Sequence, residues 1–328
     1  MFFCFLGIDK NSLVWYTVFN IVRKGTSRMR AYLTEFFDMF DYPFVAKATL
    51  ESAYERMVAD HDCSDRFASL ITAYEKDICM DYGAAIGEAA EISRAAGVEV
   101  YTGQLVLLIC FSRHLRECYR EAGIDDAIWK ESMLDLRYKT VECQLVYGVW
   151  GTFVAGWFDR FFNMTRFALG RLQFEIIPFG HEIEMNGVHL TAQSPIINVH
   201  IPRTGTPLAY ESVTEAYARA ARFFSNKLDG APIVFLCNTW LFFEKHREML
   251  APTSNIRRFM DDYVIVQTGE YEDYSQIWRL FDCNYTGDPD ALPADSSLRR
   301  AYIALIRRGE KTGWGTGIMI YQNNANTQ

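Results

Sequence analysis

The sequence lacks the local signatures by which several protein classes are recognised. Its eight cysteines form no C-x-x-C pair and show no disulfide-scaffold spacing, and its six histidines form no H-E-x-x-H motif. There is no dense Lys/Arg tract, and the net charge is −8, so attraction to phosphate backbones or anionic lipid is weak. These absences predict reduced thiols in a cytoplasmic protein, with no metal, no nucleic-acid partner and no membrane contact.

Long apolar runs are also missing. The two apolar segments near the start, residues 1–8 and 13–22, are too short to span a bilayer. Met29 follows a short basic segment and opens a more ordinary globular sequence. We therefore expect residues 1–28 to be an N-terminal extension that contributes little to the fold, either folding poorly or packing as an appendage.

Proline is absent between residues 50 and 147, where apolar residues recur at intervals of three and four. This period predicts helices over 47–60, 64–81, 84–96, 101–121 and 126–147. Gly97 and Gly123 stand where C-terminal caps are expected, and Asp125 and Asp126 give the last helix an acidic start. The N-terminal half is thus predicted to be a helical domain.

After Leu169 the period changes to two, which is typical of strands covered on one face. Strands are predicted over 171–176 and over 197–201, the latter ending at Pro202. Asn186-Gly187 is a type I′ turn signal, and it predicts a hairpin in which Met185 pairs with Val188.

The rest of the chain alternates helix and strand signals. A capping box at 212–215 precedes a helix over 216–228, and a wholly apolar run at 232–237 is typical of a central strand. The glycine-rich Gly313-x-Gly315-x-Gly317 is predicted as a turn before a strand, rather than a phosphate-binding loop. The other predicted elements are helices over 241–250, 254–261, 275–281 and 296–308, and strands over 263–267 and 317–321.

This order of elements resembles the GNAT-type N-acyltransferase fold. Four strings resemble a narrower group, the two-domain bacterial acyltransferase-domain proteins, which place a helical N-terminal domain before a GNAT-like C-terminal domain. The strings are Arg171-Leu172-Gln173-Phe174-Glu175, His200-Ile201-Pro202, Cys237-Asn238-Thr239-Trp240-Leu241 and Ser254-Asn255-Ile256-Arg257-Arg258-Phe259. The resemblance implies an α+β fold, with a helical domain over 29–165 and a GNAT-like acyltransferase domain over 166–328 built on a central, mostly antiparallel sheet.

The resemblance also implies acyl-CoA or acetyl-CoA as the cosubstrate, and no metal. GNAT enzymes usually bind the CoA pyrophosphate with a Q/R-x-x-G-x-G/A loop that supplies backbone N–H groups. The matching segment here, residues 203–208, keeps Arg203 and Gly205 but contains Pro207, which has no N–H to donate. The predicted CoA-binding residues are Arg203, Gly205, Thr206 and Ser212.

The period of two places five polar residues opposite their apolar neighbours: Arg171, Gln173, Glu175, Asn198 and His200. A solvated sheet face is the alternative. However, the combination of an acid, a base and an amide is not typical of a solvent-exposed sheet face. Acyl transfer to an amine needs a base for the amine proton and a donor for the tetrahedral oxyanion. His200 or Glu175 is the predicted base, and Arg171 and Asn198 are predicted to contact the substrate.

Three further residues are candidates for substrate binding: Cys237, Trp240 and Asn255. A Cys237 thiol paired with His200 would form a covalent acyl intermediate, but its wholly apolar surroundings are more typical of an inert core thiol. Trp240 is likewise more typical of a core, and Ser254-Asn255 of a helix cap.

The function that the resemblance implies, and that these residues could support, is direct acyl transfer from acyl-CoA to an unknown small amine or alcohol. Two alternatives stay open: a non-catalytic small-molecule binding or sensor protein on the same fold, and a hydrolase that uses Cys237. A polar cleft at the end of residues 196–202 favours the enzyme, whereas an apolar plug there favours the binder. The acceptor, the acyl length, the oligomeric state and the role of the helical half are not predicted.

Overall fold

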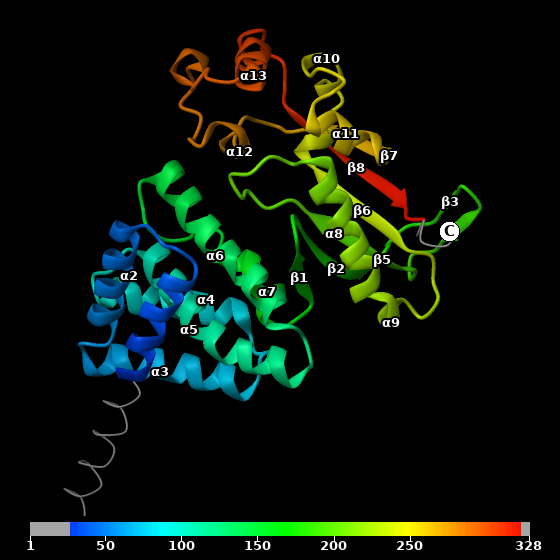
Figure 1. The fold of residues 1–328 in the computed structure, drawn as a ribbon. Helices are drawn as coiled ribbons and strands as arrows, with labels where there is room; N and C mark the ends of the chain where they lie inside the picture. The colour runs from blue at the N-terminus through cyan, green and yellow to red at the C-terminus, as the bar shows by residue number, and fades with distance from the viewer. Residues whose placement is uncertain (1–26, 323–328) are drawn as a thin grey trace, which may run out of the picture. The chain divides into compact units, whose positions relative to one another are not determined.

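The computed structural model describes residues 27–322 (Figure 1). By its internal packing the chain divides into two compact units, residues 1–115 and 116–328, and the division falls within the long helix α5 (Val100–Glu121). The N-terminal extension predicted over residues 1–28 lies almost wholly outside the described part of the chain. No helix within residues 27–322 is both long enough and apolar enough to cross a membrane.

The first unit is helical. It contains a helix over 27–39, then α2 (Phe44–Met57), α3 (His61–Lys76), α4 (Tyr82–Ala95) and the first part of α5. Asp60 and Asp81 cap α3 and α4 by accepting from the backbone N–H groups of Cys63 and Ala84. The predicted helices are confirmed with shifted ends, but the helix over 27–39 was missed in the sequence.

Two predicted helix signals hold in the structure. Gly97 and Gly123 have φ values of +62° and +69° at the ends of α4 and α5, the left-handed conformation that favours glycine. Asp125 caps α6 (Asp126–Tyr147) by accepting from the N–H of Ala127. After α6 the chain passes through the short helices η1 (Ala155–Phe158) and α7 (Asp159–Phe162).

The second unit is built on a six-stranded mixed sheet in the order β1-β2-β5-β6-β8-β7 (Figure 1). Its only parallel pair among the described strands is β5–β6, so the mostly antiparallel sheet predicted from the sequence is present in this mixed form. The first strand was not predicted, because it lies in the aromatic segment before Leu169. The strands are β1 (Arg166–Leu169), β2 (Leu172–Pro178), β5 (Pro195–His200), β6 (Val234–Thr239), β7 (Val264–Glu270) and β8 (Gly313–Ile320).

The strands β3 (Ile183–Met185) and β4 (Val188–Leu190) form a separate hairpin. Asn186 and Gly187 both have positive φ, and Met185 pairs with Val188, as the sequence predicts. The remaining elements are α8 (Tyr210–Phe223), α9 (Ser225–Leu228), η2 (Trp240–Phe242), α10 (His246–Met249), α11 (Asn255–Asp261), α12 (Trp278–Phe281), η3 (Pro289–Ala291) and α13 (Ser297–Arg307).

The two faces of the sheet differ in polarity near its centre. On one face Phe174 of β2 and Phe235 of β6 pack together and against Tyr217 of α8. Helix α6 packs against β1, where the Ser132 hydroxyl accepts from the N–H of Ala168. The face opposite Phe174 carries the polar side chains of β2 and β5, which form the candidate site.

Three local predictions are wrong. Helix α8 begins at Tyr210 and not at residue 216, and Ser212 donates to the carbonyl of Ala209 within the first turn instead of capping the helix. The single helix expected over 241–250 is broken into η2 and α10. The expected glycine turn is strand β8, where a Cβ at Gly313 would lie 2.4 Å from the ring of Phe243.

Candidate active site

The polar side chains of β2 and β5 meet because the two strands are antiparallel neighbours. Gln173 is directly opposite His200, and Glu175 is directly opposite Asn198. Since residues two apart on a strand share a face, all four side chains lie on one face of the sheet. Gln173 and Glu175 are each only 2% exposed, so this face is covered and is not the solvated surface considered as the alternative.

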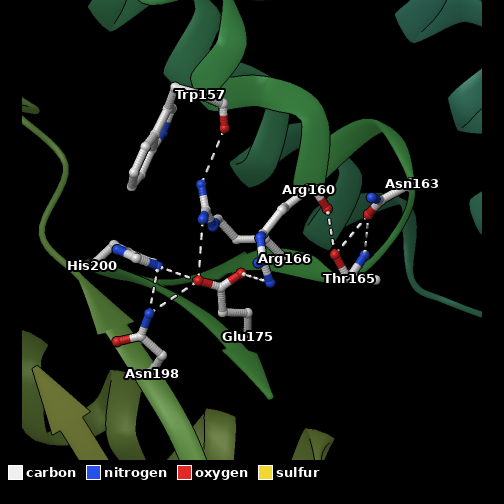
Figure 2. Close-up of polar contacts among 8 residues, drawn as sticks. All are labelled: Trp157, Arg160, Asn163, Thr165, Arg166, Glu175, Asn198 and His200. Carbon is white, nitrogen blue, oxygen red and sulfur yellow. Dashed lines mark hydrogen bonds and ion pairs between the residues drawn. The ribbon is translucent and has the colours of Figure 1, made fainter. Parts of the chain in front are cut away.

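Glu175 is the centre of the cluster (Figure 2). One carboxylate oxygen, Oε1, lies 2.7 Å from Nε2 of His200 and accepts from the Asn198 amide at 3.0 Å. The same oxygen accepts from the Arg166 guanidinium at 3.1 Å, and Oε2 forms an ion pair with Arg160, also at 3.1 Å. The carboxylate is therefore held by four groups from three segments of the chain, α7, β1 and β5.

Arg166 and Trp157 pack against each other beside the Glu175 cluster. The Arg166 guanidinium lies 4.0 Å from the centroid of the Trp157 ring, a cation–π contact, and donates to the Trp157 carbonyl at 3.1 Å. The indole also meets the His200 imidazole edge to face, with centroids 4.9 Å apart (Figure 2). In the turn before Arg166, the Thr165 hydroxyl donates to the Asn163 side chain at 2.6 Å.

These contacts determine the protonation states of Glu175 and His200. Burial raises the pKa of Glu175, but the hydrogen bond to His200 and the charge of Arg166 outweigh it and hold that pKa at about 2. Burial lowers the pKa of His200, and the hydrogen bond to Glu175 only partly offsets this. At neutral pH the site therefore holds an ionised carboxylate and a neutral imidazole.

His200 faces a cavity of about 720 Å³. Its walls come from β2, β5, β6, α6, η1 and the segment over 271–298, all in the second unit. Polar groups include Gln173, Asn238 and Thr239, while Trp240, Trp278 and Leu298 supply apolar surface. Within residues 27–322 no group of three or more His, Cys, Asp or Glu side chains is arranged to hold a metal ion.

The cavity opens where the parallel strands β5 and β6 separate. The two strands pair only at Ile197 with Phe235 and at Asn198 with Leu236. Beyond these pairs, His200 and Ile201 on one side and Asn238 on the other all line the cavity.

Comparison with known proteins places this arrangement in a family. Residues 31–164 match the family model of the N-acyltransferase N-terminal domain, and residues 167–319 match that of the GNAT-like C-terminal domain. The chain is a two-domain acyltransferase-domain protein. The family identified from the four sequence strings is thus confirmed.

Solved structures show the same fold. A crystal structure of an acyltransferase mutant in complex with octanoyl-CoA has a TM-score of 0.70 at 19% identity. An acyltransferase in complex with decanoyl-CoA and teicoplanin, and one in complex with CoA and 10C-teicoplanin, have TM-scores of 0.67 and 0.68 at 19% and 20% identity. Each comparison covers 97% of both chains. Among curated proteins, none matches the sequence significantly.

In this acyltransferase-domain chain the predicted CoA loop borders the cavity. Arg203 lines the cavity and Gly205 has a φ of +77°, whereas the Thr206 hydroxyl is bonded to that of Thr204 at 2.7 Å. Arg171 also lines the cavity and holds the loop, donating to the carbonyl of Pro202. Ser212 is not among the lining residues of the cavity, because its hydroxyl is turned back to Ala209.

Arg203 already has a partner. Its guanidinium lies 2.6 Å from one oxygen of Asp282, and Arg299 lies 2.7 Å from the other. Arg203 is thus held at the rim of the cavity by a carboxylate that two arginines share.

The remaining predicted substrate residues are spread over the cavity wall. Trp240 and Asn255 both line it, and Asn255 is the first residue of α11, capped by Ser254. Cys237 borders the cavity too, but the strand register puts its side chain on the face opposite Asn198 and Leu236. Burial raises the pKa of this thiol, so it stays protonated and the pairing with His200 is not formed.

Trp157 and Arg166, and also Asp135 of α6, which lines the cavity, were not found from the sequence. The two former lie in an aromatic segment in which no strand was predicted. Asp135 carries a usable signal: it lies in α6 between the buried residues Ser132 and Leu136, on the apolar face of a predicted helix. An acid in such a position is rare unless it is paired or functional.

Proposed function

We propose that the chain transfers an acyl group from acyl-CoA directly to the amine of a small acceptor, with His200 as the general base. The observation that carries this proposal is the 2.7 Å contact between His200 Nε2 and Glu175 at the wall of a 720 Å³ cavity. A base held by an ionised acid beside an enclosed space is the arrangement that amine deprotonation requires.

The contact with Glu175 assigns the imidazole tautomer. The ionised Glu175 accepts the Nε2–H, so the lone pair of His200 is on Nδ1. No described residue forms a hydrogen bond with Nδ1. As the acceptor amine attacks the thioester carbon, Nδ1 takes its proton, the tetrahedral intermediate collapses and the CoA thiolate leaves. Glu175 stabilises the imidazolium that forms, and Arg166 and Asn198 keep Glu175 in place.

The acyl-CoA cosubstrate is supported by the separation of β5 and β6 beside His200. Solved structures of the same fold contain octanoyl-CoA, decanoyl-CoA or CoA. In this chain we assign the pyrophosphate to the loop over 203–208, with Arg203, Gly205 and Thr206 as its binding residues. Ser212 contributes through the first turn of α8 and not through its hydroxyl, which is engaged. Trp240, Asn255 and the apolar wall of the cavity would contact the acyl chain or the acceptor.

The alternatives have weaker support. A hydrolase that uses Cys237 lacks a base, because the thiol lies on the other face of the sheet from His200. A non-catalytic binder would be favoured by an apolar plug at the end of β5, but this end carries His200 and opens into the cavity. The hydrogen-bonded pair of Glu175 and His200 therefore favours an acyltransferase over both alternatives.

The proposal is tested by calorimetry with octanoyl-CoA and by release of free CoA thiol in the presence of a primary amine. We expect binding, amine-dependent thiol release, and a loss of about 10²-fold or more in turnover for His200→Gln with unchanged octanoyl-CoA affinity. His189→Gln is the matched control, since His189 is exposed on β4. Absence of CoA binding at millimolar ligand would remove the cosubstrate, and full activity of His200→Gln would remove the base.

A further inference from the structure

A second acid lies on the wall of the same cavity. Asp135 projects from α6, is 1% exposed and is one of the residues that line the cavity. It is not part of the Glu175 cluster. Its position in the middle of a 22-residue helix fixes its backbone, so the carboxylate is held in place by secondary structure and not by a loop.

The Asp135 carboxylate has no partner. Neither of its oxygens accepts a hydrogen bond from the described residues. Burial raises the pKa of Asp135 and so favours its neutral form. The nearby Gln173 amide and Trp157 indole favour the charged form, but without the geometry of a hydrogen bond to it. The Trp157 indole N–H is itself without a partner in the described chain.

The cations around the cavity are engaged elsewhere. Lys139, one turn along α6 from Asp135, donates to Glu142 at 2.8 Å. Arg203 is paired with Asp282, and Arg171 donates to loop carbonyls. Arg279 donates to the Gln276 side chain and lies over the Trp278 ring. Of the two carboxylates of α6 that line the cavity, Glu142 is neutralised and Asp135 is not.

Ionising a buried carboxylate is costly, and the charge of Lys139 offsets the desolvation of Asp135 only in part, so the pKa of Asp135 stays raised. A cation that enters the cavity would offset the rest of this cost. Such a cation would be held close to the base: Gln173, beside Asp135, is directly opposite His200 in the strand pair, and Trp157 contacts the His200 ring. Asp135 is thus separated from the His200 imidazole by one side chain on each side, that of Gln173 or that of Trp157.

We propose that Asp135 is an ammonium-binding residue, which selects an acceptor that carries a protonated amine over the equivalent alcohol. The inference rests on the proposed function in one respect, that this cavity receives the acceptor. An ammonium has no free lone pair, so the bound acceptor loses one proton to solvent before its neutral amine attacks the thioester. The aromatic residues of the wall, Trp157, Trp240 and Trp278, suit an acceptor that joins the ammonium to an apolar body.

The test uses 2-phenylethylamine and its neutral analogue 2-phenylethanol as probes, with the full chain and calorimetry in the absence of CoA. We expect the wild type to bind the amine at least tenfold more tightly than the alcohol. Asp135→Asn should weaken amine binding by about tenfold or more, as loss of a charged hydrogen bond predicts, and leave alcohol binding unchanged. Glu215→Gln, which removes an exposed carboxylate of α8, is the control for net charge.

A second variant, Asp135→Leu, tests whether a loss of amine binding in Asp135→Asn is caused only by the new asparagine amide. Replacing an unpaired buried carboxyl group with an apolar residue should leave the fold intact or stabilise it, and this variant should also lose amine preference. Equal affinity of the wild type for amine and alcohol, no binding of either, or an amine affinity unchanged in both Asp135 variants would each overturn the inference. Octanoyl-CoA binding, measured on the same samples, reports on the proposed function separately: its loss in the wild type would overturn that function without touching the amine result.

Discussion

The guanidinium of Arg171 donates to the carbonyl oxygen of Pro202 at 3.0 Å, and its other nitrogens lie 3.4 Å from the carbonyls of Thr206 and Pro207. One side chain from the turn before β2 therefore holds both ends of the loop proposed to bind the CoA pyrophosphate. Pro207 cannot supply an N–H to that loop, so the loop depends on this outside contact for its shape.

Replacing Arg171 with leucine should release the loop. We expect the affinity for CoA to fall by about tenfold, because one strong and two weaker hydrogen bonds to the loop are lost, and calorimetry measures it. Arg171→Lys should recover part of the affinity, since lysine can reach one carbonyl but not three. Arg120→Leu, at an exposed arginine of α5, should change nothing. Wild-type affinity in Arg171→Leu would show that the loop holds its shape unaided.

Asp282 and a CoA phosphate would compete for Arg203. Asp282→Asn should therefore tighten CoA binding several-fold at low salt, because it frees the guanidinium from its carboxylate. Asp290→Asn, at an exposed pair with Arg307, is the control. Weaker CoA binding in Asp282→Asn would show instead that the ion pair positions Arg203 for the ligand.

The pH dependence of turnover reports on His200. Burial lowers its pKa below the ordinary value of 6.5, so the acid limb of kcat/KM should have its midpoint below pH 6.5. Glu175→Gln removes a charge that raises this pKa, while Arg166 and Arg160 remain. We expect the midpoint to move to still lower pH and the plateau to fall by about 10- to 100-fold. A midpoint that rises in Glu175→Gln contradicts the assignment.

Glu175 should also contribute to stability. Its folded pKa of about 2 is below the ordinary 4.5, so its contribution is fully present above pH 4.5 and is lost as the pH falls through 2. At pH 7, Glu175→Gln should reduce the free energy of unfolding by on the order of 3 kcal/mol. In urea titrations this difference should shrink steadily below pH 4.5. Glu184→Gln, at an exposed position of β3, should show no such trend.

The close packing around the glycines of β8 leads to a prediction about stability. An added Cβ at Gly313 would meet the Phe243 ring at 2.4 Å and a backbone carbonyl at 2.5 Å. Gly313→Ala should therefore destabilise the second unit by about 1 to 3 kcal/mol, seen as a lower thermal midpoint. Gly156→Ala, where a Cβ meets nothing within 4 Å, is the control.

The sequence predicted the polar face because its signal is local. Alternation by two along β2 and β5 shows that Glu175 and His200 each lie opposite apolar neighbours, and the antiparallel register then brings them together. The Asn186-Gly187 turn, which determines its own hairpin, was predicted for the same reason. The assignment of catalytic and CoA-binding roles stays a prediction, as does the domain boundary at 165–166.

Features that depend on distant segments could not be predicted. Helix α8 begins six residues before the expected start at residue 216, since the packing of Val213 and Ala216 in the core outweighs the local propensity. The glycines of β8 looked like a turn because the aromatic rings that require them come from η2, about seventy residues earlier in the chain. Arg166 was missed for a different reason, because no strand was predicted in the aromatic segment that contains it.

The place of β8 in the sheet has a consequence for the order of folding. It inserts between β6 and β7, both of which are synthesised before it. Until residues 313–320 emerge, β6 has one edge unpaired and β7 has no neighbour in the sheet, although Val264 and Val266 of β7 are already available for pairing. Unpaired edges of this kind associate with other chains. The edges of β6 and β7 are thus open to other chains until β8 completes the sheet.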